Sequence, residues 1–399
     1  TKHNIIQPHL HFIPFNPKEV ITHQKPKKTL MSSTKKAAVL LVGCGQPQKP
    51  IRSMGAYHAI QIIDGRVPDA ELKYVVEPWY MSDAAKSSKA PGVEQFFAWK
   101  EEQEKTGVSF FETVTDVPVA GDGELRLAII SARTADNPAL LDACVDNGCR
   151  AIYLEKPGAT TVNDLEAMRD KASAANCAVY MGFNKNVSSY LTKTRHFVQN
   201  QSGDAKYDVT FVHNNNYKNT VEELSECFER NSEGMLKNMA IHELAICVTY
   251  YGVAVETIAS VVADKEYSSL QTLGGFTDFD RLKFKIVTKD GVEINVAADR
   301  CGGDDSVGIV TDAQTGAELA RYSMPDEETV ANIPTLQSKY GDAMPYFFTQ
   351  DPDYLKLKNL VVQNFVHGQP ATGVADINVA IETLKVAEYL TPILQEQLK

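Results

Sequence analysis

Two glycines follow a short apolar run near the start of the sequence, and their position predicts a phosphate-binding turn. Gly43 and Gly45 lie two residues apart directly after Ala37–Val42, and Ser53 can cap a helix that begins soon afterwards. Glycines at such a turn let the backbone approach a pyrophosphate, and the N–H groups of the following helix can bind it. The residues therefore predict the first half of a dinucleotide-binding fingerprint.

The third glycine of that fingerprint is displaced along the chain. Position 48 is Gln48 and the next candidate is Gly55, so residues 46–52 form an apparent insertion. The strand before the turn and the helix after it favour dinucleotide binding. The alternative is a glycine-rich turn with a purely structural role.

Glu77 directly follows the second predicted strand, 72–76. A carboxylate at that point commonly binds both ribose hydroxyls and repels a 2′-phosphate, which favours NAD over NADP. Lys49 and Arg52 weaken this preference, because either could reach a phosphate, and NADP therefore stays open. The alternative for Glu77 is a solvated acid in a loop.

The segment 212–217 is unusually polar for a strand. His213, Asn214 and Tyr217 carry an imidazole, an amide and a phenol, which suit a hydroxyl-rich ligand. We therefore expect these side chains to face a substrate. The alternative is a strand end that runs into a loop.

The elements that must hold these residues alternate between strands and helices up to about residue 181. Ala37–Val42 is an apolar run typical of a parallel strand covered on both faces. Further strands are expected at 72–76, 125–130, 151–154 and 178–181, and helices at 53–64, 93–105, 139–147 and 162–175. This alternation predicts an α/β Rossmann fold with a doubly wound parallel sheet.

The pattern changes after about residue 205. One helix is expected at 234–250 and a last helix at 374–390. The turns at 289–291 and 315–316 indicate hairpins between strands expected at 209–212, 258–262, 282–287, 293–297, 308–311 and 318–321. The result is an α+β domain with a large, mainly antiparallel sheet and helices on one face.

We expect three parts: an extension at 1–36, a dinucleotide-binding domain at 37–183, and a substrate-binding and oligomerisation domain at 184–399. The extension holds four prolines and a single acid, Glu19, which favours disorder. It has no apolar core of secretory length. Organellar targeting stays an alternative because acids are few, although Arg is absent.

Composition restricts the class of partner. Acids outnumber bases by 51 to 40, a net charge of −11, so phosphate backbones and anionic membranes would be repelled. No apolar stretch reaches about 18 residues. The seven cysteines form no C-x-x-C pair. We therefore expect reduced thiols, a cytoplasmic location and no metal site, nucleic acid or membrane partner.

Four short motifs lie at wide intervals along the chain. Glu155, Lys156 and Pro157 form an E-K-P motif after Ala151–Leu154, and residues 55–58 read G-x-x-H. Residues 182–185 read G-F-N-K, and 234–242 approach G-x-x-x-D-x-G-x-H. In this order the motifs resemble the Gfo/Idh/MocA oxidoreductase family, over about residues 37–390.

The resemblance implies hydride transfer between a nicotinamide and a substrate carbon that bears a hydroxyl. It implies that Lys156 hydrogen-bonds the reacting oxygen and stabilises its charge, and that His242 exchanges the hydroxyl proton. Glu155 and Lys156 would also contact the cofactor, and Lys185 the substrate. The alternatives are a surface lysine paired with Glu155 and a core histidine.

The sequence departs from the family pattern where a catalytic aspartate is usual, because it has Asn238. Asn238 and His242 are four residues apart on the predicted helix, so both could line a cleft and contact substrate. An amide can orient a ligand but cannot take up a proton. Ser131 and Arg133, after the strand at 125–130, are candidate cofactor ligands. Arg133 could instead bind a substrate carboxylate or form a structural salt bridge.

We therefore expect an NAD(P)-dependent oxidoreductase for a small polyol, sugar, oxo or imino substrate, assembled as a homodimer or homotetramer through the C-terminal sheet. The alternative is a dinucleotide-binding sensor or interaction module without turnover. Asn238 and the altered glycine turn favour that alternative, whereas Lys156 and His242 oppose it. An imine reductase is a further interpretation, because a protonated C=N has less need of a carboxylate base.

Overall fold

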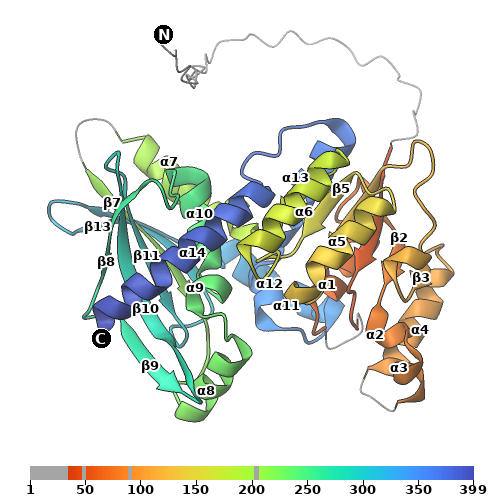
Figure 1. Cartoon of the computed structure of the whole chain (residues 1–399), viewed down its shortest axis with the longest axis horizontal. Helices are drawn as coiled ribbons and strands as arrows, with labels where there is room; N and C mark the ends of the chain where they lie inside the picture. Colours follow the sequence, from red (N-terminus) through yellow and green to blue (C-terminus); the bar gives the residue numbers. More distant parts are fainter. Residues whose placement is uncertain (1–34, 47–50, 89–91, 202–205) are drawn as a thin grey trace, which may run out of the picture. The chain divides into compact units, whose positions relative to one another are not determined.

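Two sheets organise the structure, a computed structural model that describes residues 35–46, 51–88, 92–201 and 206–399 (Figure 1). The predicted extension lies outside the described residues, apart from its last two positions. Residues 35–399 form a single unit, and the division at residue 183 stays a prediction.

The first sheet has six parallel strands in the order β3-β2-β1-β4-β5-β6. The strand order reverses between β1 and β4, and ligands of such sheets bind at the carboxyl ends of strands near that reversal. The predicted doubly wound sheet is confirmed. The bounds are Ala37–Val42 (β1), Ala70–Val76 (β2), Ser109–Phe111 (β3), Arg126–Ile130 (β4), Ala151–Leu154 (β5) and Ala178–Met181 (β6).

The helices around this sheet begin where the sequence offers caps. The Ser53 hydroxyl accepts the Ala56 N–H at the start of α1, and Thr161 does the same for α6. Apolar strand residues then bury against the helices on both faces. The bounds are Met54–Ile63 (α1), Pro78–Met81 (α2), Asp83–Ser87 (α3), Val93–Glu104 (α4), Asn137–Asp146 (α5) and Val162–Ala174 (α6).

The second sheet has the order β13-β12-β7-β11-β10-β8, with β9 paired to β10. The β7–β11 pair is parallel and the other pairs are antiparallel, so a mainly antiparallel sheet and both predicted hairpins are confirmed. The bounds are Tyr207–Asn214 (β7), Ile258–Ala263 (β8), Ser269–Leu273 (β9), Phe276–Thr288 (β10), Glu293–Asp299 (β11), Ser306–Asp312 (β12) and Glu318–Met324 (β13).

The single helix predicted at 234–250 is wrong, because two helices occupy this stretch. The backbone leaves helical geometry at Ala240, where ψ is 6°, so α9 (Met235–Asn238) and α10 (Ile241–Tyr251) are separate. Met239 and Ala240 bury in the core, and the unbroken apolar pattern hid the break. The other helices against this sheet are α7 (Ser189–Gln199) and α8 (Val221–Arg230).

The last third of the chain returns to the first sheet. Helices α11 (Glu327–Tyr340), α12 (Pro345–Thr349) and α13 (Asp351–His367) follow the second sheet, and none of them was predicted. Helix α13 packs Leu357, Val361 and Val362 on the face of β1 that carries Val39 and Leu41. The first strand is therefore covered by residues from the far end of the chain.

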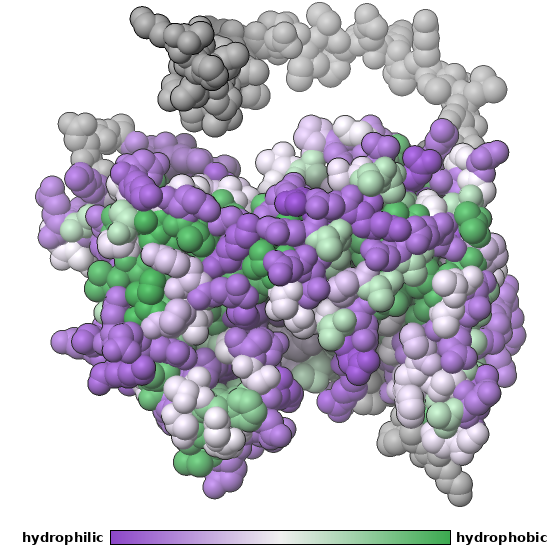
Figure 2. All heavy atoms as spheres, in the orientation of Figure 1, coloured by the Kyte–Doolittle hydropathy of each residue, from purple (hydrophilic) through white to green (hydrophobic). Residues whose placement is uncertain are grey.

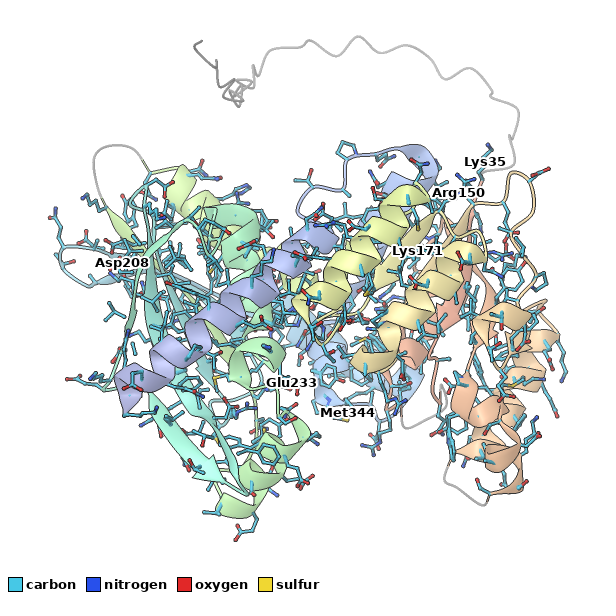
Figure 3. The ribbon with its side chains drawn as sticks, in the orientation of Figure 1. Lys35, Arg150, Lys171, Asp208, Glu233 and Met344 are labelled. Atoms are coloured by element: carbon cyan, nitrogen blue, oxygen red, sulfur yellow. The ribbon has the colours of Figure 1, made fainter. Side chains whose placement is uncertain are left out.

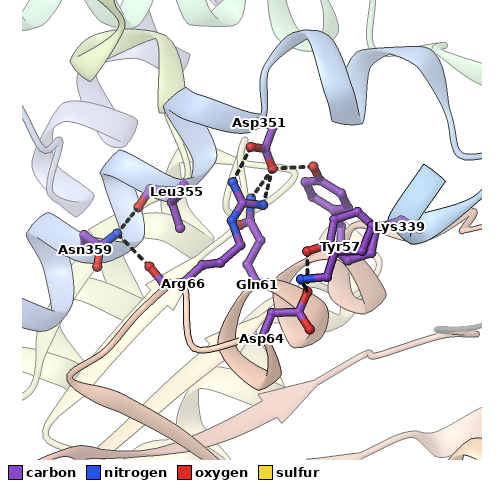
Figure 4. A network of polar contacts seen from close by, with 9 residues as sticks. Tyr57, Gln61, Asp64, Arg66, Lys339, Asp351, Leu355 and Asn359 are labelled. Atoms are coloured by element: carbon purple, nitrogen blue, oxygen red, sulfur yellow. Dashed lines mark hydrogen bonds and ion pairs between the residues drawn. The ribbon is translucent and has the colours of Figure 1, made fainter. Parts of the chain in front are cut away.

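A polar network ties α13 to α1 (Figure 4). The buried Asp351 carboxylate accepts hydrogen bonds from Tyr57, from Gln61 at 2.7 Å, and from both Arg66 amino groups at 2.9 and 2.5 Å. Lys339 of α11 pairs with Asp64 at 2.9 Å. These contacts fix the C-terminal helices on the helix that follows the glycine turn.

Helix α14 (Ile377–Leu398) connects the two halves and runs beyond the predicted end at 390. Its first half buries side chains in the core of the first sheet, and its second half does so in the core of the second. In Figure 1 it crosses from the helices of one sheet to the other sheet. The two sheets therefore share one structural support.

Hydrophilic residues cover most of the visible face of the described chain, interspersed with smaller hydrophobic patches (Figure 2). All seven cysteines are free, as predicted. Within the described ranges, no helix has the length and apolar character needed to cross a membrane. The same residues contain no group of three or more His, Cys, Asp or Glu placed to hold a metal.

Candidate active site

A cleft of about 640 Å³ opens beside the carboxyl ends of β4, β5 and β6. The opposite wall comes from the end of β7, from α8–α10 and from the segment 344–354. Glu233, whose charge acts on Lys156, and Met344, which lines the cleft, mark this region in Figure 3. The position agrees with the crevice at which doubly wound sheets bind ligands.

The glycine turn lies beside this cleft and has the geometry that a pyrophosphate needs. Gly43 and Gly45 have φ of +79° and +67°, in the left-handed region that glycine adopts without strain. A Cβ on Gly55 would lie 2.1 Å from the Gly43 carbonyl oxygen. Gly55 thus gives the close helix packing expected of the third fingerprint glycine. The turn and the capped start of α1 therefore fit a dinucleotide.

The Glu77 carboxylate is hydrogen-bonded to the glycine turn. Its Oε2 accepts the Gly45 N–H at 2.6 Å, and the residue is 6% exposed. Burial raises the pKa of Glu77, although backbone N–H groups act against this rise. The alternative that Glu77 is a solvated acid in a loop is therefore wrong. Contact between Glu77 and a ribose stays a prediction. Lys49 lies outside the described residues.

The loop after β4 separates its two candidate ligands. Ser131 lines the cleft. Arg133 instead has a side chain that is 85% exposed, and its Nε donates to Asp136 at 2.8 Å. The structure therefore shows the salt-bridge alternative for Arg133 and does not bring its side chain to the cleft.

Lys156 reaches across the cleft from the end of β5. Its Nζ donates to the backbone oxygen of Asn238 at 3.3 Å. Burial lowers the pKa of Lys156, although Glu155, Glu233 and Glu243 act in the opposite direction. The lysine therefore links the end of β5 to α9 across the cleft, and its contact with a substrate oxygen stays a prediction.

Glu155 is held by a buried chain of contacts that the sequence did not reveal. Its Oε1 accepts from His58 Nε2 at 2.9 Å, and Lys358 Nζ donates to His58 Nδ1 at 2.9 Å. Burial and then Lys358 lower the pKa of His58 to about 4. The alternative of a surface ion pair between Glu155 and Lys156 is wrong, because Glu155 is bonded to His58.

Asn238 and His242 both line the cleft, although they belong to different helices. The expectation that they share one helix face is wrong, because the break at Ala240 lies between them. His242 is 6% exposed, and its Nδ1 is buried without a hydrogen-bond partner among the described residues. Burial and then Lys156 and Lys185 lower the pKa of His242.

Glu243 is the main residue that the sequence analysis missed. It is fully buried, its Oε1 accepts from Lys185 Nζ at 2.8 Å, and its Oε2 bonds to His213 Nδ1 at 3.1 Å. Burial alone would raise its pKa, but Lys185 and His213 lower it below the usual value. A single acid in the apolar stretch 239–247 was the available signal, because a buried charge needs partners.

Only part of the polar segment 212–217, at the end of β7, lines the cleft. His213 and Tyr217 line the cleft, and their contact with a substrate stays a prediction, whereas Asn214 donates to Asp305 at 2.8 Å and is absent from the lining. The Tyr217 hydroxyl accepts from Arg230 at 2.9 Å. Further lining residues not predicted are Asn215, Asn216, Arg230, Asp304, Tyr346 and Gln350.

Comparison with known proteins agrees with this geometry. Residues 54–183 match the family model described as "Oxidoreductase family, NAD-binding Rossmann fold", Gfo/Idh/MocA. No curated protein matches the chain.

Several solved structures share the fold over both halves. The scyllo-inositol dehydrogenase from Lactobacillus casei with bound NAD(H) and scyllo-inositol is 14% identical, with 91% of this chain and 97% of that chain covered and a TM-score of 0.62. A myo-inositol dehydrogenase from Corynebacterium glutamicum ATCC 13032 is 17% identical, with coverage of 90% and 97% and a TM-score of 0.63. GenD2 from gentamicin A biosynthesis, in complex with NAD, is 15% identical, with coverage of 94% and 97% and a TM-score of 0.64.

The matched region contains Gly55 and the E-K-P motif, whose Glu155 and Lys156 line the cleft, and the turn at Gly43 and Gly45 lies shortly before it. Residues 54–183 therefore match the Gfo/Idh/MocA family of oxidoreductases with an NAD-binding Rossmann fold, and the fold of both halves is that of the solved dehydrogenases.

Proposed function

We propose that this oxidoreductase transfers hydride between NAD and a hydroxyl-bearing carbon of a small polyol or sugar. The observation that carries the proposal is the meeting of Lys156, His242 and amide side chains in one cleft at the carboxyl ends of the Rossmann strands. Amides, imidazoles and a phenol supply donors and acceptors for several hydroxyls at once. The inositol dehydrogenases with the same fold act on ligands of that kind by name.

The nicotinamide supplies the hydride acceptor, and the residues of this chain supply binding and proton chemistry. Lys156 donates to the substrate oxygen and stabilises the negative charge that develops there when the hydroxyl proton leaves. Burial lowers the pKa of Lys156, which makes its proton easier to release than that of a lysine in water. Asn238 orients a neighbouring hydroxyl by hydrogen bonds.

A binding module without turnover is favoured by one observation only. Asn238 lines the cleft at the position where the family pattern has a carboxylate. A protein of this kind would bind NAD and the polyol but exchange no hydride. An imine substrate is the second alternative for the same reason.

We further propose that the protein assembles as a homo-oligomer through the open face of the second sheet, in the cytoplasm. Helices α7, α10 and α14 share one core with the buried side of this sheet. Val262 on β8 and Leu319 on β13 are 58% and 44% exposed. A second copy would remove such side chains from water.

The function is tested by incubating the purified protein with NAD and a panel of polyols, sugars and inositols while NADH absorbance is recorded. Turnover on at least one hydroxylated compound, abolished in Lys156→Ala, is expected. Tight NAD binding by calorimetry without turnover in either direction would favour the sensor alternative. Activity confined to cyclic imines with NADH would favour the imine reductase.

A further inference from the structure

The two histidines of the cleft make opposite hydrogen-bonding arrangements. His213 Nδ1 lies 3.1 Å from Oε2 of the fully buried Glu243. An ionised carboxylate only accepts hydrogen bonds, so Nδ1 must carry the ring proton. The lone pair of a neutral His213 is therefore on Nε2, the nitrogen left for a ligand in the cleft that His213 lines.

His242 has the reverse arrangement. Its Nδ1 is buried and, within the described residues, has no hydrogen-bond partner. A proton on that nitrogen would be a buried N–H without an acceptor, which costs about 1–3 kcal/mol. The neutral ring therefore carries its proton on Nε2, and His242 can donate to a ligand but cannot accept from one.

The charges around His213 come from every element packed against it. Glu243 and His242 face it from α10, Lys185 from the 3-10 turn Asn184–Val187, Lys156 from the end of β5, and Asp304 from the β11–β12 connection. Burial and then Lys185 lower the pKa of His213, while Glu243 opposes them. Burial and Lys185 therefore favour the neutral ring, and Glu243 stabilises the ring once it is protonated.

We infer that His213, oriented by Glu243, is the proton acceptor of the cleft, the role that the family resemblance would give to His242. The inference rests on the proposed hydride transfer. In oxidation, the hydroxyl proton moves to His213 Nε2 while the C–H electron pair leaves with its hydrogen as hydride to NAD⁺, and a C=O bond forms. The imidazolium then releases its proton to water. His242 donates to a neighbouring oxygen, and Glu243 is a positioning residue.

Matched glutamine variants separate the two histidines. Glutamine retains an N–H donor but cannot take up a proton. His213→Gln is expected to lower kcat by about 10²–10⁴-fold with an unchanged dissociation constant for NAD. His242→Gln is expected to retain kcat within about tenfold, since one donor replaces another. His196→Gln, at an exposed position of α7, is the control and should match the wild type. The opposite ranking of His213→Gln and His242→Gln would overturn the inference.

Glu243 is tested by its effect on the pH profile. Glu243→Gln removes the charge that stabilises protonated His213, so the acidic limb of kcat/KM should move to lower pH and kcat should fall. Glu243→Asp should restore part of both. A fall in kcat with an unmoved acidic limb would show that Glu243 has only a structural role and would overturn this part.

A measurement without turnover distinguishes failure of this inference from failure of the proposed function. Nitrogen-15 spectra of the histidine rings in the intact protein report which nitrogen carries the proton. A proton on Nδ1 of His213 and on Nε2 of His242 is expected. The reverse tautomers would overturn the inference even if the protein oxidises polyols. The expected tautomers in a protein that turns over no substrate would refute the proposed function instead.

Discussion

Replacing Asp351 should test how far the C-terminal helices stabilise the dinucleotide-binding half. Its carboxylate accepts from Tyr57, Gln61 and Arg66 of the first 66 residues, and its side chain is 2% exposed. Asp351→Ala leaves these donors without an acceptor in a site from which water is largely excluded. The expected result is a large loss of stability rather than the small one typical of surface charges.

The magnitude follows from the contacts. Removing one member of a buried, hydrogen-bonded ion pair costs about 3–5 kcal/mol. The Arg66 side chain is 23% exposed and can recover some hydration. The expected loss of unfolding free energy is therefore at the lower end of this range, about 3 kcal/mol. For a chain of this size that corresponds to a fall in Tm of roughly 4 °C. Asp351→Asn retains one acceptor and should cost about 1–2 kcal/mol.

Calorimetric unfolding at several pH values is the assay. Burial would raise the pKa of Asp351, but hydrogen bonds from Arg66, Tyr57 and Gln61 lower it below the usual value. The carboxylate therefore stabilises the fold above the unfolded pKa of about 4, and this contribution disappears as pH falls through the folded pKa. The difference in Tm between wild type and Asp351→Asn should be largest near neutral pH and shrink in acid.

The exposed pair Glu318–Arg321 provides a matched control. Both side chains are nearly half exposed, so Glu318→Ala should leave Tm unchanged. Equal Tm values for Asp351→Ala and Glu318→Ala would refute the reasoning, because they would show that the network in Figure 4 contributes no more than a surface contact. A Tm difference that does not change with pH would refute the assignment to the charge.

Lys156→Ala should lower kcat by about 10²–10³-fold in steady-state assays while NAD titration gives an unchanged dissociation constant, because its donor acts mainly in the transition state. Glu77→Ala should improve NADP binding relative to NAD in parallel titrations, and tighter NADP binding by the wild type would contradict the role of Glu77. Asn238→Asp should raise the pKa of Lys156 through opposite charge, so the corresponding limb of the pH profile should move to higher pH. An unchanged profile would show that a charge at position 238 does not act on Lys156. Sedimentation at micromolar concentration should show an oligomer, and a monomer alone would contradict the proposed assembly.

Much of the first sheet could be predicted because its signals are local. Ala37–Val42 is an apolar run, Ser53 caps the next helix, and Gly43 and Gly45 follow the strand directly. The strand Ser109–Phe111 escaped prediction because three residues show no periodicity. The cleft positions of Lys156 and His242 followed from motifs rather than from local physics.

The parts that could not be predicted depend on contacts between distant residues. Glu243 meets Lys185 from 58 positions away and His213 from 30, and no local pattern announces either pair. His58 and Lys358 are 300 positions apart. Asn214 has the right chemistry for a ligand, but its side-chain amide donates to Asp305, which directly precedes the neighbouring strand β12.

The position of α13 on β1 has a consequence for how the protein is made. Val39 leaves the ribosome long before Leu357, its neighbour in the first core, and at about 5–20 residues per second the interval is roughly 15–60 s. Part of the apolar face of the nascent strand therefore stays uncovered until α13, which begins at Asp351, has been made. The dinucleotide site is thus translated first and completed last, so a premature stop after the second sheet would leave every residue of the glycine turn present on an unfinished core.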